Sequence, residues 1–421
     1  MVSKNKRNDE TKPRLLCIDM AYTLKMVKER ELQQEFESRS CGGYFEHVWG
    51  VHPIADVPES RLLNYEGFKL KIVNYSKDQT IIEGLSSYYA GLKFLLPLNF
   101  LVSQIRFTRY LISLVKNEHI DIILVTDPYF TGLIGLFIKW FTKAKLVIWV
   151  VANYDEIYQA IGRPAMPRLY KKRWIEKIIE KIVFPRADLV AGGNHNNLEF
   201  SLANGASLKK STVFPIGKLI HRQHVLDPKS RERDILFSSS DDIYYFIYVG
   251  RMLNVKYPDD VIRAFGLICK GIQNCALIMV GDGPMLKELE AMAFEMGIQD
   301  KIHFTGNINQ VRLANILGSC FAALSPLTGR SLIEASLAAL PIVAYDRDWQ
   351  LDFVTKSGNG IVVPFRDWQQ MAVEALHLVH CPEDKKRYSE ASRCIGLTFC
   401  DTDQIYAHEQ NEFNKLLQTR V

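Results

Sequence analysis

Short apolar runs alternate with helix-length segments in two separate stretches of this chain. Apolar runs of roughly four to eight residues bounded by turn residues are typical of buried strands. When a helix separates two such strands, it returns the chain to the same edge of the sheet, so the strands run parallel. The alternation therefore predicts an α/β fold with two doubly wound, Rossmann-like domains, each built on a parallel sheet.

The first stretch lies in the N-terminal half of the chain. Its predicted strands cover residues 14–20, 45–51, 69–74, 121–126, 145–152 and 188–191, and its predicted helices include 97–116 and a basic segment at 167–184. The second stretch starts at Tyr244, with strands at 244–250, 276–281, 301–306 and 320–325 and helices at 258–270, 284–296 and 310–317. We therefore expect an N-terminal domain at 1–217 with a disordered polar tail over about 1–12, an interdomain connection at 218–242, and a C-terminal domain at 243–400.

Charge is distributed unevenly between the two halves. Residues 1–217 carry 30 basic and 22 acidic residues, a net charge of +8, whereas the remaining residues carry 22 and 25, a net charge of −3. A basic first half fits an acidic acceptor or an anionic membrane surface, and it equally fits a solvated excess of lysine. The overall charge of +5 is too small to argue for nucleic acid.

Cysteine spacing and hydropathy limit the class of protein further. The eight cysteines are scattered with no C-x-x-C pair, which argues against a disulfide scaffold or a zinc site and fits a reducing cytosol. The most apolar stretches, 94–102 and 133–141, fall well short of the roughly 20 residues that a spanning helix needs. We therefore expect a cytoplasmic protein, with any membrane contact peripheral and at the inner face.

The stretch from Ser325 to Asp346 has the pattern of a phosphate-binding turn. A Pro- and Gly-containing turn leads into a helical apolar pattern over 332–340, Pro341 ends that pattern, and residues 342–344 form a short buried strand. A helix N-terminus offers free backbone N–H groups and a partial positive charge, and both favour phosphate. One carboxylate, Glu334, lies within the predicted helix.

Three earlier turns add chemistry to the C-terminal half. The sequence YVGRMLNVK sets Gly250, Arg251 and Lys256 at a strand end, where two cations suit a diphosphate. Taken alone, the turns GDGP, with Gly283, and FTGN, with Gly306, indicate no more than a turn from a strand into a helix.

These four turns, in this order, resemble those of the retaining glycosyltransferases of family four, which have the two-domain GT-B fold. The resemblance covers about residues 244–365 and extends more loosely over the first half. It implies that the C-terminal domain binds a nucleotide-sugar donor, that the N-terminal domain binds the acceptor in a facing cleft, and that a final helix within 401–421 returns to the first domain.

The resemblance also assigns roles residue by residue. Arg251 and Lys256 match the catalytic pair that binds the donor pyrophosphate and stabilises the leaving diphosphate. Glu334 matches the carboxylate that binds the ribose hydroxyls. The complete set of matching donor-binding residues is Gly250, Gly283, Gly306, Asn307, Ile308, Gly329, Arg330, Ser331, Leu332 and Glu334.

Departures from the family pattern concern the sugar. Pro326 stands where relatives have a glutamate near the donor sugar, and Arg330 replaces an aliphatic residue. Asp348 follows the next strand and could supply the missing acid. In the N-terminal half, acceptor or sugar contacts are expected at polar strand ends, namely Asp127, Asn153 and Asp155.

The sequence thus predicts a retaining, metal-independent hexosyltransferase with a UDP- or GDP-linked donor, no separate cofactor, and a glycan, lipid-linked or small-molecule acceptor. Surface polysaccharide or glycolipid synthesis is the expected setting. Two alternatives stay open: a nucleotide-sugar-binding protein of the same fold without transferase activity, and an epimerase or phosphorylase.

Overall fold

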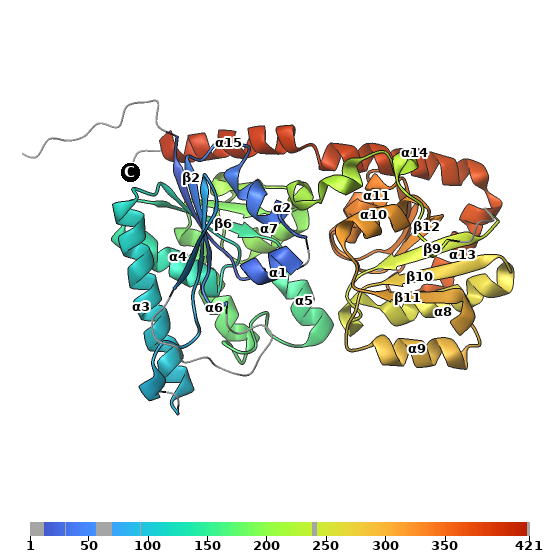
Figure 1. Ribbon diagram of the computed structural model, residues 1–421, viewed down its shortest axis with the longest axis horizontal. Coiled ribbons are helices and arrows are strands. Elements are labelled where there is room, and N and C mark those ends of the chain that lie inside the picture. The colour runs from blue at the N-terminus through green and yellow to red at the C-terminus, as the bar shows by residue number, and fades with distance from the viewer. Residues whose placement is uncertain (1–11, 30, 56–69, 93, 238–241, 419–421) are drawn as a thin grey trace, which may run out of the picture. The chain divides into compact units, whose positions relative to one another are not determined.

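The chain divides into two compact units in the computed structural model, which describes residues 12–29, 31–55, 70–92, 94–237 and 242–418 (Figure 1). Unit 1 comprises Met1–Tyr158, Gly162–Pro215 and Asp403–Val421, and unit 2 comprises Gln159–Ile161 and Ile216–Thr402. Each unit is built on one mainly parallel sheet with helices, so the predicted α/β class with two Rossmann-like domains is confirmed. The predicted tail over 1–12 lies outside the described residues, apart from Lys12.

The sheet of unit 1 has eight strands. In spatial order they are β3 (Lys71–Ser76), β4 (Gln79–Glu83), β2 (His47–His52), β1 (Arg14–Ile18), β5 (Ile122–Val125), β6 (Lys145–Val150), β7 (Leu189–Gly192) and β8 (Ser211–Val213). All neighbours pair in parallel except β3 and β4, which form an antiparallel hairpin at one edge. Strand β4 was not predicted, although its five residues are all buried.

The longer helices of unit 1 are α3 (Leu96–Asn117), α4 (Phe130–Phe141), α5 (Tyr154–Ile161), α6 (Arg173–Val183) and α7 (His195–Ala203), after the short α1 (Leu24–Glu29) and α2 (Gln34–Glu37). The helix predicted at 167–184 begins only at Arg173. Helix α5 was missed, because the preceding strand was expected to run into an open polar end at Asn153.

A helix from the end of the chain completes the core of unit 1. Helix α15 (Thr402–Gln418) buries Phe413, whose ring lies 5.4 Å from the rings of both Phe45 and Phe214. Gln410 donates a hydrogen bond to the carbonyl of Cys41, at 2.9 Å. Segments separated by more than 350 residues therefore share one apolar core.

The sheet of unit 2 has six parallel strands. In spatial order they are β11 (Ile302–Gly306), β10 (Cys275–Val280), β9 (Tyr244–Val249), β12 (Ala322–Ser325), β13 (Ile342–Tyr345) and β14 (Gly360–Val363). Alternate residues of β9 point to opposite faces, so Phe246 and Tyr248 join one apolar cluster and Tyr245 and Ile247 join the other. Both faces of the sheet are thus buried, as a doubly wound fold requires.

Seven helices among the described residues of unit 2 complete these two layers. They are α8 (Pro258–Gly271), α9 (Leu286–Glu295), α10 (Gln310–Gly318), α11 (Ser331–Leu337), α12 (Trp349–Thr355), α13 (Trp368–His380) and α14 (Pro382–Phe399). Helix α11 and strand β13 confirm the helix and strand predicted on either side of Pro341.

The predicted interdomain connection, 218–242, differs from the structure. Residues 216–237 form short helical turns inside unit 2 rather than a linker. His224 Nε2 lies 3.0 Å from Gln310 Oε1, and Arg231 donates to the carbonyl of Ala314 at 2.9 Å. These partners lie 86 and 83 residues further along the chain, so a local run of polar residues could not indicate that the segment is packed.

Candidate functional site

The predicted donor residues lie on loops that follow four neighbouring strands of unit 2. Because β11, β10, β9 and β12 are adjacent and parallel, their carboxyl ends meet at one edge of the sheet. That edge is where open α/β sheets bind ligands. The fold therefore brings Gly250, Gly283, Gly306 and Gly329 to one edge, although the first and last are 79 residues apart.

Glycines allow the backbones of these loops to touch. Gly281, with φ 124°, donates its N–H to the carbonyl of Gly306 at 3.0 Å, and a Cβ at Gly281 would lie 2.1 Å from the Gly250 carbonyl oxygen. A Cβ at Gly283 would lie 2.3 Å from the carbonyl oxygen of Met252. Any side chain at either position would force the loops apart. At these positions, the loops after β9 and β10 are therefore in direct contact through their backbones, with no side chain between them.

Two cations, Arg251 and Lys256, lie on the loop that follows β9. Among the described residues, neither the Arg251 nor the Lys256 side chain forms a hydrogen bond or an ion pair. A Cβ built on Gly329 would lie 3.9 Å from Lys256 Nζ, so the ammonium lies beside the Gly329 turn. Burial lowers the pKa of Lys256, the charge of Asp348 opposes that shift, and the charge of Arg251 adds to it. An anion bound between the two cations would relieve their repulsion.

The turn before α11 is held in place by its own hydrogen bonds. The Ser331 hydroxyl donates to the carbonyl of Val249 at 2.8 Å, which ties the start of α11 to the end of β9. Gly329 has φ 83°, and its carbonyl accepts the N–H of Leu332 at 3.1 Å. Of the predicted phosphate-binding amides, that of Leu332 is therefore engaged within the turn. The backbone N–H groups of Gly329, Arg330 and Ser331, which come before Leu332 in the chain, stay predicted phosphate-binding groups.

Glu334 is half-buried in the first turn of α11. Its negative charge acts on His224, where it partly opposes the lowering of the pKa by burial. It also acts on Cys400, where it adds to the rise of the pKa to about 12 that burial causes. The negative charge of Glu334 therefore acts on both His224 and Cys400. The predicted contact of Glu334 with a ribose stays a prediction.

The loop after β11 carries the residues predicted beside the base. Gly306 has φ 65°, a conformation that favours glycine. Asn307 is exposed, and Ile308 is half-buried against the apolar cluster of that face. Asn309 then caps α10 by accepting the N–H of Arg312 at 2.8 Å. The loop therefore presents one polar and one apolar side chain from a fixed backbone.

One residue beside Pro326, Gln350, extends the set found from sequence, which already included Asp348. Gln350 is buried, and its amide nitrogen donates to the carbonyls of Pro326 at 2.6 Å and Tyr345 at 3.0 Å. Asp348 caps α12 by accepting the N–H of Trp349, and its charge reaches Lys256. Gln350 was not singled out from the sequence. A glutamine among apolar residues in a helical segment was the available signal, since a buried amide needs partners.

In unit 1, Asp127 is a buried carboxylate at the end of β5. Its oxygens accept hydrogen bonds from the backbone N–H of Tyr129, at 2.8 Å, and from the hydroxyl of Thr131, at 2.6 Å. Burial raises the pKa of Asp127 to about 6, even though these hydrogen bonds lower it. Asp127 therefore fixes the turn into α4, and its contact with an acceptor or sugar stays a prediction.

The pH dependence of stability tests the burial of Asp127. Its pKa is near 4 in the unfolded chain and about 6 in the folded one, so the folded state binds the extra proton between these values. Stability should therefore fall as pH rises from about 4 through about 6, by roughly 3 kcal/mol, and then level off. We expect Asp127→Asn to remove this component when denaturant unfolding of both proteins is compared across the range. Parallel pH profiles for the two proteins would contradict the assignment.

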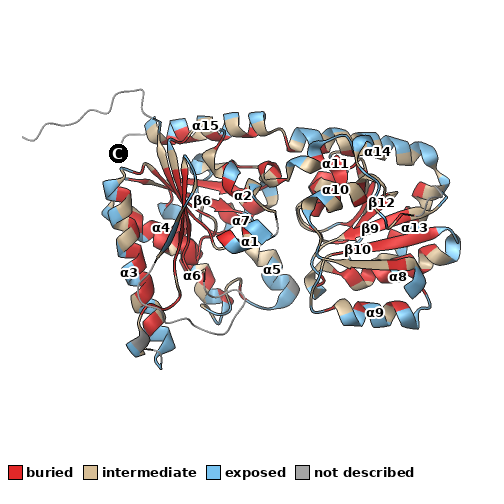
Figure 2. Ribbon diagram, viewed as in Figure 1, coloured by how far each residue is buried: buried red, intermediate tan, exposed pale blue. Residues whose placement is uncertain are grey.

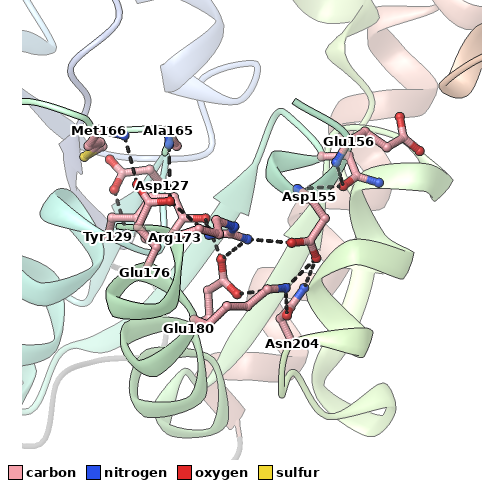
Figure 3. A network of polar contacts seen from close by, with 12 residues as sticks. Asp127, Tyr129, Asp155, Glu156, Ala165, Met166, Arg173, Glu176, Glu180 and Asn204 are labelled. Carbon is pink, nitrogen blue, oxygen red and sulfur yellow. Dashed lines mark hydrogen bonds and ion pairs between the residues drawn. The ribbon is translucent and has the colours of Figure 1, made fainter. Parts of the chain in front are cut away.

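Asp155 belongs to a polar network that joins α5 and α6 (Figure 3). Asn153 caps α5 by accepting the N–H groups of Asp155 and Glu156, both at 3.2 Å. Asp155 accepts hydrogen bonds from Arg173 at 2.8 Å and from Lys177 at 2.6 Å. Burial opposes the change, but these bonds lower the pKa of Asp155. Both residues thus have structural partners, and their predicted contact with a substrate stays a prediction.

Comparisons with known proteins agree with this geometry. The profile of the glycosyl transferases group 1 family matches residues 230–394, which cover the whole donor edge of unit 2. An uncharacterized glycosyltransferase of Methanocaldococcus jannaschii is 25% identical over 241 residues. That match spans 56% of this chain and 55% of the relative, so the chain spans about half the length of the curated relative.

Solved structures share the fold across nearly the whole chain. Sucrose-phosphate synthase from Thermosynechococcus elongatus superposes with a TM-score of 0.70 at 14% identity, over 97% of this chain and 100% of that one. The Anabaena protein HepE, solved in complex with UDP, superposes with a TM-score of 0.63 at 13% identity, over 96% and 100% of the two chains. Together, these matches identify unit 2 as a glycosyl transferases group 1 domain within a chain of the GT-B fold.

Proposed function

We propose that this protein is a retaining glycosyltransferase that moves a sugar from a nucleotide-sugar donor to a glycan, lipid-linked or small-molecule acceptor. One observation carries the proposal: Lys256 lies beside the Gly329 turn, the charge of Arg251 acts on it, and neither side chain has an ion pair among the described residues, at the ligand-binding edge of a domain that matches the group 1 profile. Two cations without ion pairs, one of them beside a glycine turn, suit a diphosphate.

In this proposal the two cations act on the leaving group. The bond between the sugar C1 and the diphosphate oxygen breaks, and Arg251 and Lys256 stabilise the negative charge that develops on the diphosphate. The acceptor oxygen bonds to C1 on the same face, and its proton passes to the departing phosphate, which conserves anomeric configuration. The reaction needs no carboxylate nucleophile from the protein, and the cations supply the positive charge without a metal ion.

The other donor residues have binding roles. Glu334 accepts hydrogen bonds from the ribose hydroxyls, Asn307 and Ile308 lie beside the base, and the amides of the Gly329 turn meet the phosphates. UDP is the first nucleotide to test because the Anabaena relative was solved with it, and GDP is the second. Unit 1 binds the acceptor, and the setting we propose is polysaccharide or glycolipid synthesis in the cytoplasm.

Nucleotide binding gives a direct test. We expect UDP or GDP to raise the thermal unfolding midpoint, since a ligand at 100 times its Kd stabilises the folded state by roughly 2.7 kcal/mol. ADP completes the set, and uridine and guanosine are matched controls because they lack the diphosphate that Arg251 and Lys256 would bind. If no nucleoside diphosphate shifts the midpoint, the donor site is wrongly assigned.

A second candidate function is donor binding without transfer. Pro326 favours it, because relatives have a carboxylate near the sugar at this position and the Pro326 ring offers no hydrogen bond in its place. Release of the nucleoside diphosphate from the corresponding nucleotide sugar separates the candidates. A transferase releases it faster when acceptor is present, a binding protein does not release it, an epimerase releases it without acceptor, and a phosphorylase requires free phosphate.

A further inference from the structure

Helix α6 of unit 1, coloured by burial in Figure 2, exposes apolar side chains along one side and buries three charged side chains on the other. Trp174, Ile178 and Ile182 recur every fourth residue along one side and are 62%, 49% and 38% exposed. The opposite side buries the charged residues Arg173, Glu176 and Glu180 beside the apolar residues Ile179 and Val183. A helix on the surface of a soluble domain normally shows the reverse arrangement, with its apolar stripe against the core.

The buried ions fix this orientation (Figure 3). Arg173 forms ion pairs with Asp155 at 2.8 Å, Glu176 at 3.0 Å and Glu180 at 2.7 Å. Glu176 also accepts the backbone N–H of Met166 at 2.9 Å. Turning the helix to bury its apolar stripe would break all of these contacts, so the stripe is held outward.

Helix α3 repeats the arrangement in its N-terminal half. Leu98, Leu101 and Ile105 are exposed on one side, whereas Asn99 and Ser103 are fully buried on the other. The buried side is held by hydrogen bonds, since Asn99 donates to the carbonyl of Tyr89 at 2.7 Å and Ser103 accepts the N–H of Tyr88 at 2.9 Å. A second helix is therefore locked with leucine and isoleucine facing solvent.

Helix α4 packs against both α3 and α6 and adds three exposed aromatic rings at its end. Phe137 lies 5.0 Å from Phe141 and 6.3 Å from Trp140, measured between ring centroids. The ends of α4 and α6 are joined through Arg186, whose carbonyl accepts from Lys139 and whose guanidinium donates to the carbonyl of Ile182. We call the exposed apolar residues of these three helices the apolar face. They are Leu98, Leu101, Ile105, Phe137, Trp140, Phe141, Trp174, Ile178 and Ile182.

The exposed charged residues on the three helices of the apolar face have one sign. Helices α3 and α4 contain no acidic residue, and the two acidic residues of α6, Glu176 and Glu180, are buried. The exposed charged residues on and beside the three helices are Arg106, Arg109, Lys116, Lys143, Lys171, Lys172, Lys181 and Arg186. Among the described residues, the acids beside these helices are half-buried: Glu118 caps α3, and Asp188 pairs with Lys139 at 2.7 Å. An apolar surface whose exposed charges are those of lysine and arginine is complementary to negative charge around an apolar interior.

We propose that the apolar face is a docking surface for an anionic lipid bilayer. Exposed tryptophan and aliphatic side chains would enter the boundary between headgroups and acyl chains, and the rim of lysine and arginine would pair with anionic headgroups. Lysine is depleted at protein–protein interfaces, which favours lipid over a protein partner. No helix among the described residues has the length and hydropathy to cross a bilayer, so the helices lie on its surface.

This surface belongs to the unit that we propose binds the acceptor, so docking would bring that unit to lipid-linked acceptors. The inference about the surface itself does not rest on the proposed transfer reaction. Vesicle binding is measured without donor or acceptor. A protein that does not bind vesicles could therefore still be a transferase, and a protein with an inactive donor site could still bind vesicles.

The test is co-sedimentation of the full chain with vesicles. We expect binding to vesicles of phosphatidylcholine and phosphatidylglycerol, weaker binding to phosphatidylcholine alone, and loss of binding as salt is raised. The double variant Trp174→Ala, Ile178→Ala should bind about tenfold more weakly or worse. Phe294→Ala with Val311→Ala, two exposed apolar residues of unit 2, is the matched control and should bind like the parent protein.

Two matched charge-neutralising variants complete the test. Neutralising Lys171 and Lys172 to glutamine should weaken binding to anionic vesicles roughly tenfold, whereas the same change at the exposed Lys209 and Lys210 should have little effect. Circular dichroism should show that every variant is folded. The proposal is overturned if anionic and neutral vesicles bind equally, if the Trp174 and Ile178 variant binds like its control, or if that variant loses only self-association of the chain.

Discussion

Replacing Arg251 or Lys256 with alanine should lower turnover by about 100-fold or more while leaving the fold intact. The expected size is that of removing one donor that stabilises developing charge in a transition state. Neither side chain has a hydrogen bond or ion pair among the described residues, so its removal leaves no stranded partner in the protein. The effect should therefore appear in the chemistry and in diphosphate affinity, not in stability.

The measurement is the rate of nucleoside diphosphate release from the donor whose nucleotide gives the thermal shift. Lys270→Ala is the matched control, because Lys270 is an exposed lysine at the end of α8 and lies away from the donor loops in sequence. Near-parental turnover in both Arg251→Ala and Lys256→Ala would exclude the diphosphate role. Loss of activity accompanied by a large fall in the unfolding midpoint would indicate a structural role instead.

Replacing Arg173 with methionine should destabilise unit 1 by about 3–5 kcal/mol, because the change strands buried carboxylates. Glu176 and Glu180 have fully buried side chains, and Arg173 is an ion-pair partner of both. Burial raises the pKa of Glu180, and the bonds from Tyr129 and Arg173 oppose that rise. Without the guanidinium, the network loses the charge that makes two buried carboxylates tolerable.

Thermal or denaturant unfolding measures this loss, and a domain of this size should lose roughly 10 °C in its midpoint. Arg168→Met, at an exposed arginine, is the control and should change little. Combining Arg173→Met with Glu180→Gln should recover part of the stability, since the double variant removes one stranded charge. A loss of under about 1 kcal/mol for Arg173→Met would show that the network is not needed for stability.

The sequence predicted both sheets and most strands, because apolar runs between helical segments depend on local pattern alone. The hairpin strand β4 was missed because its sequence, QTIIE, is short and polar at both ends. Helix α5 had a readable signal, an asparagine followed three residues later by glutamate, which matches a helix N-cap. The donor turns could be ordered from sequence because each glycine turn follows its own strand.

The outward apolar side of α6 could not be predicted in the same way. Trp174, Ile178 and Ile182 have the spacing that normally indicates a buried stripe. Their exposure depends on partners of the opposite side, namely Tyr129, whose hydroxyl donates to Glu180 at 2.5 Å, and Asp155. These partners lie on other elements, 51 and 18 residues from the side chains they contact. Only the tertiary structure brings them together.

The contribution of α15 to the core of unit 1 has a consequence for biosynthesis. Residues 216–402 leave the ribosome before α15 does, so unit 2 can fold while unit 1 still lacks the ring of Phe413 against Phe45 and Phe214. During that interval the apolar residues of unit 1 that α15 covers, such as Phe45 and Phe214, are exposed to solvent. Nascent chains would then need protection from aggregation. We expect unit 1, although most of it is synthesised first, to finish folding last, because it can be completed only after α15 has been synthesised.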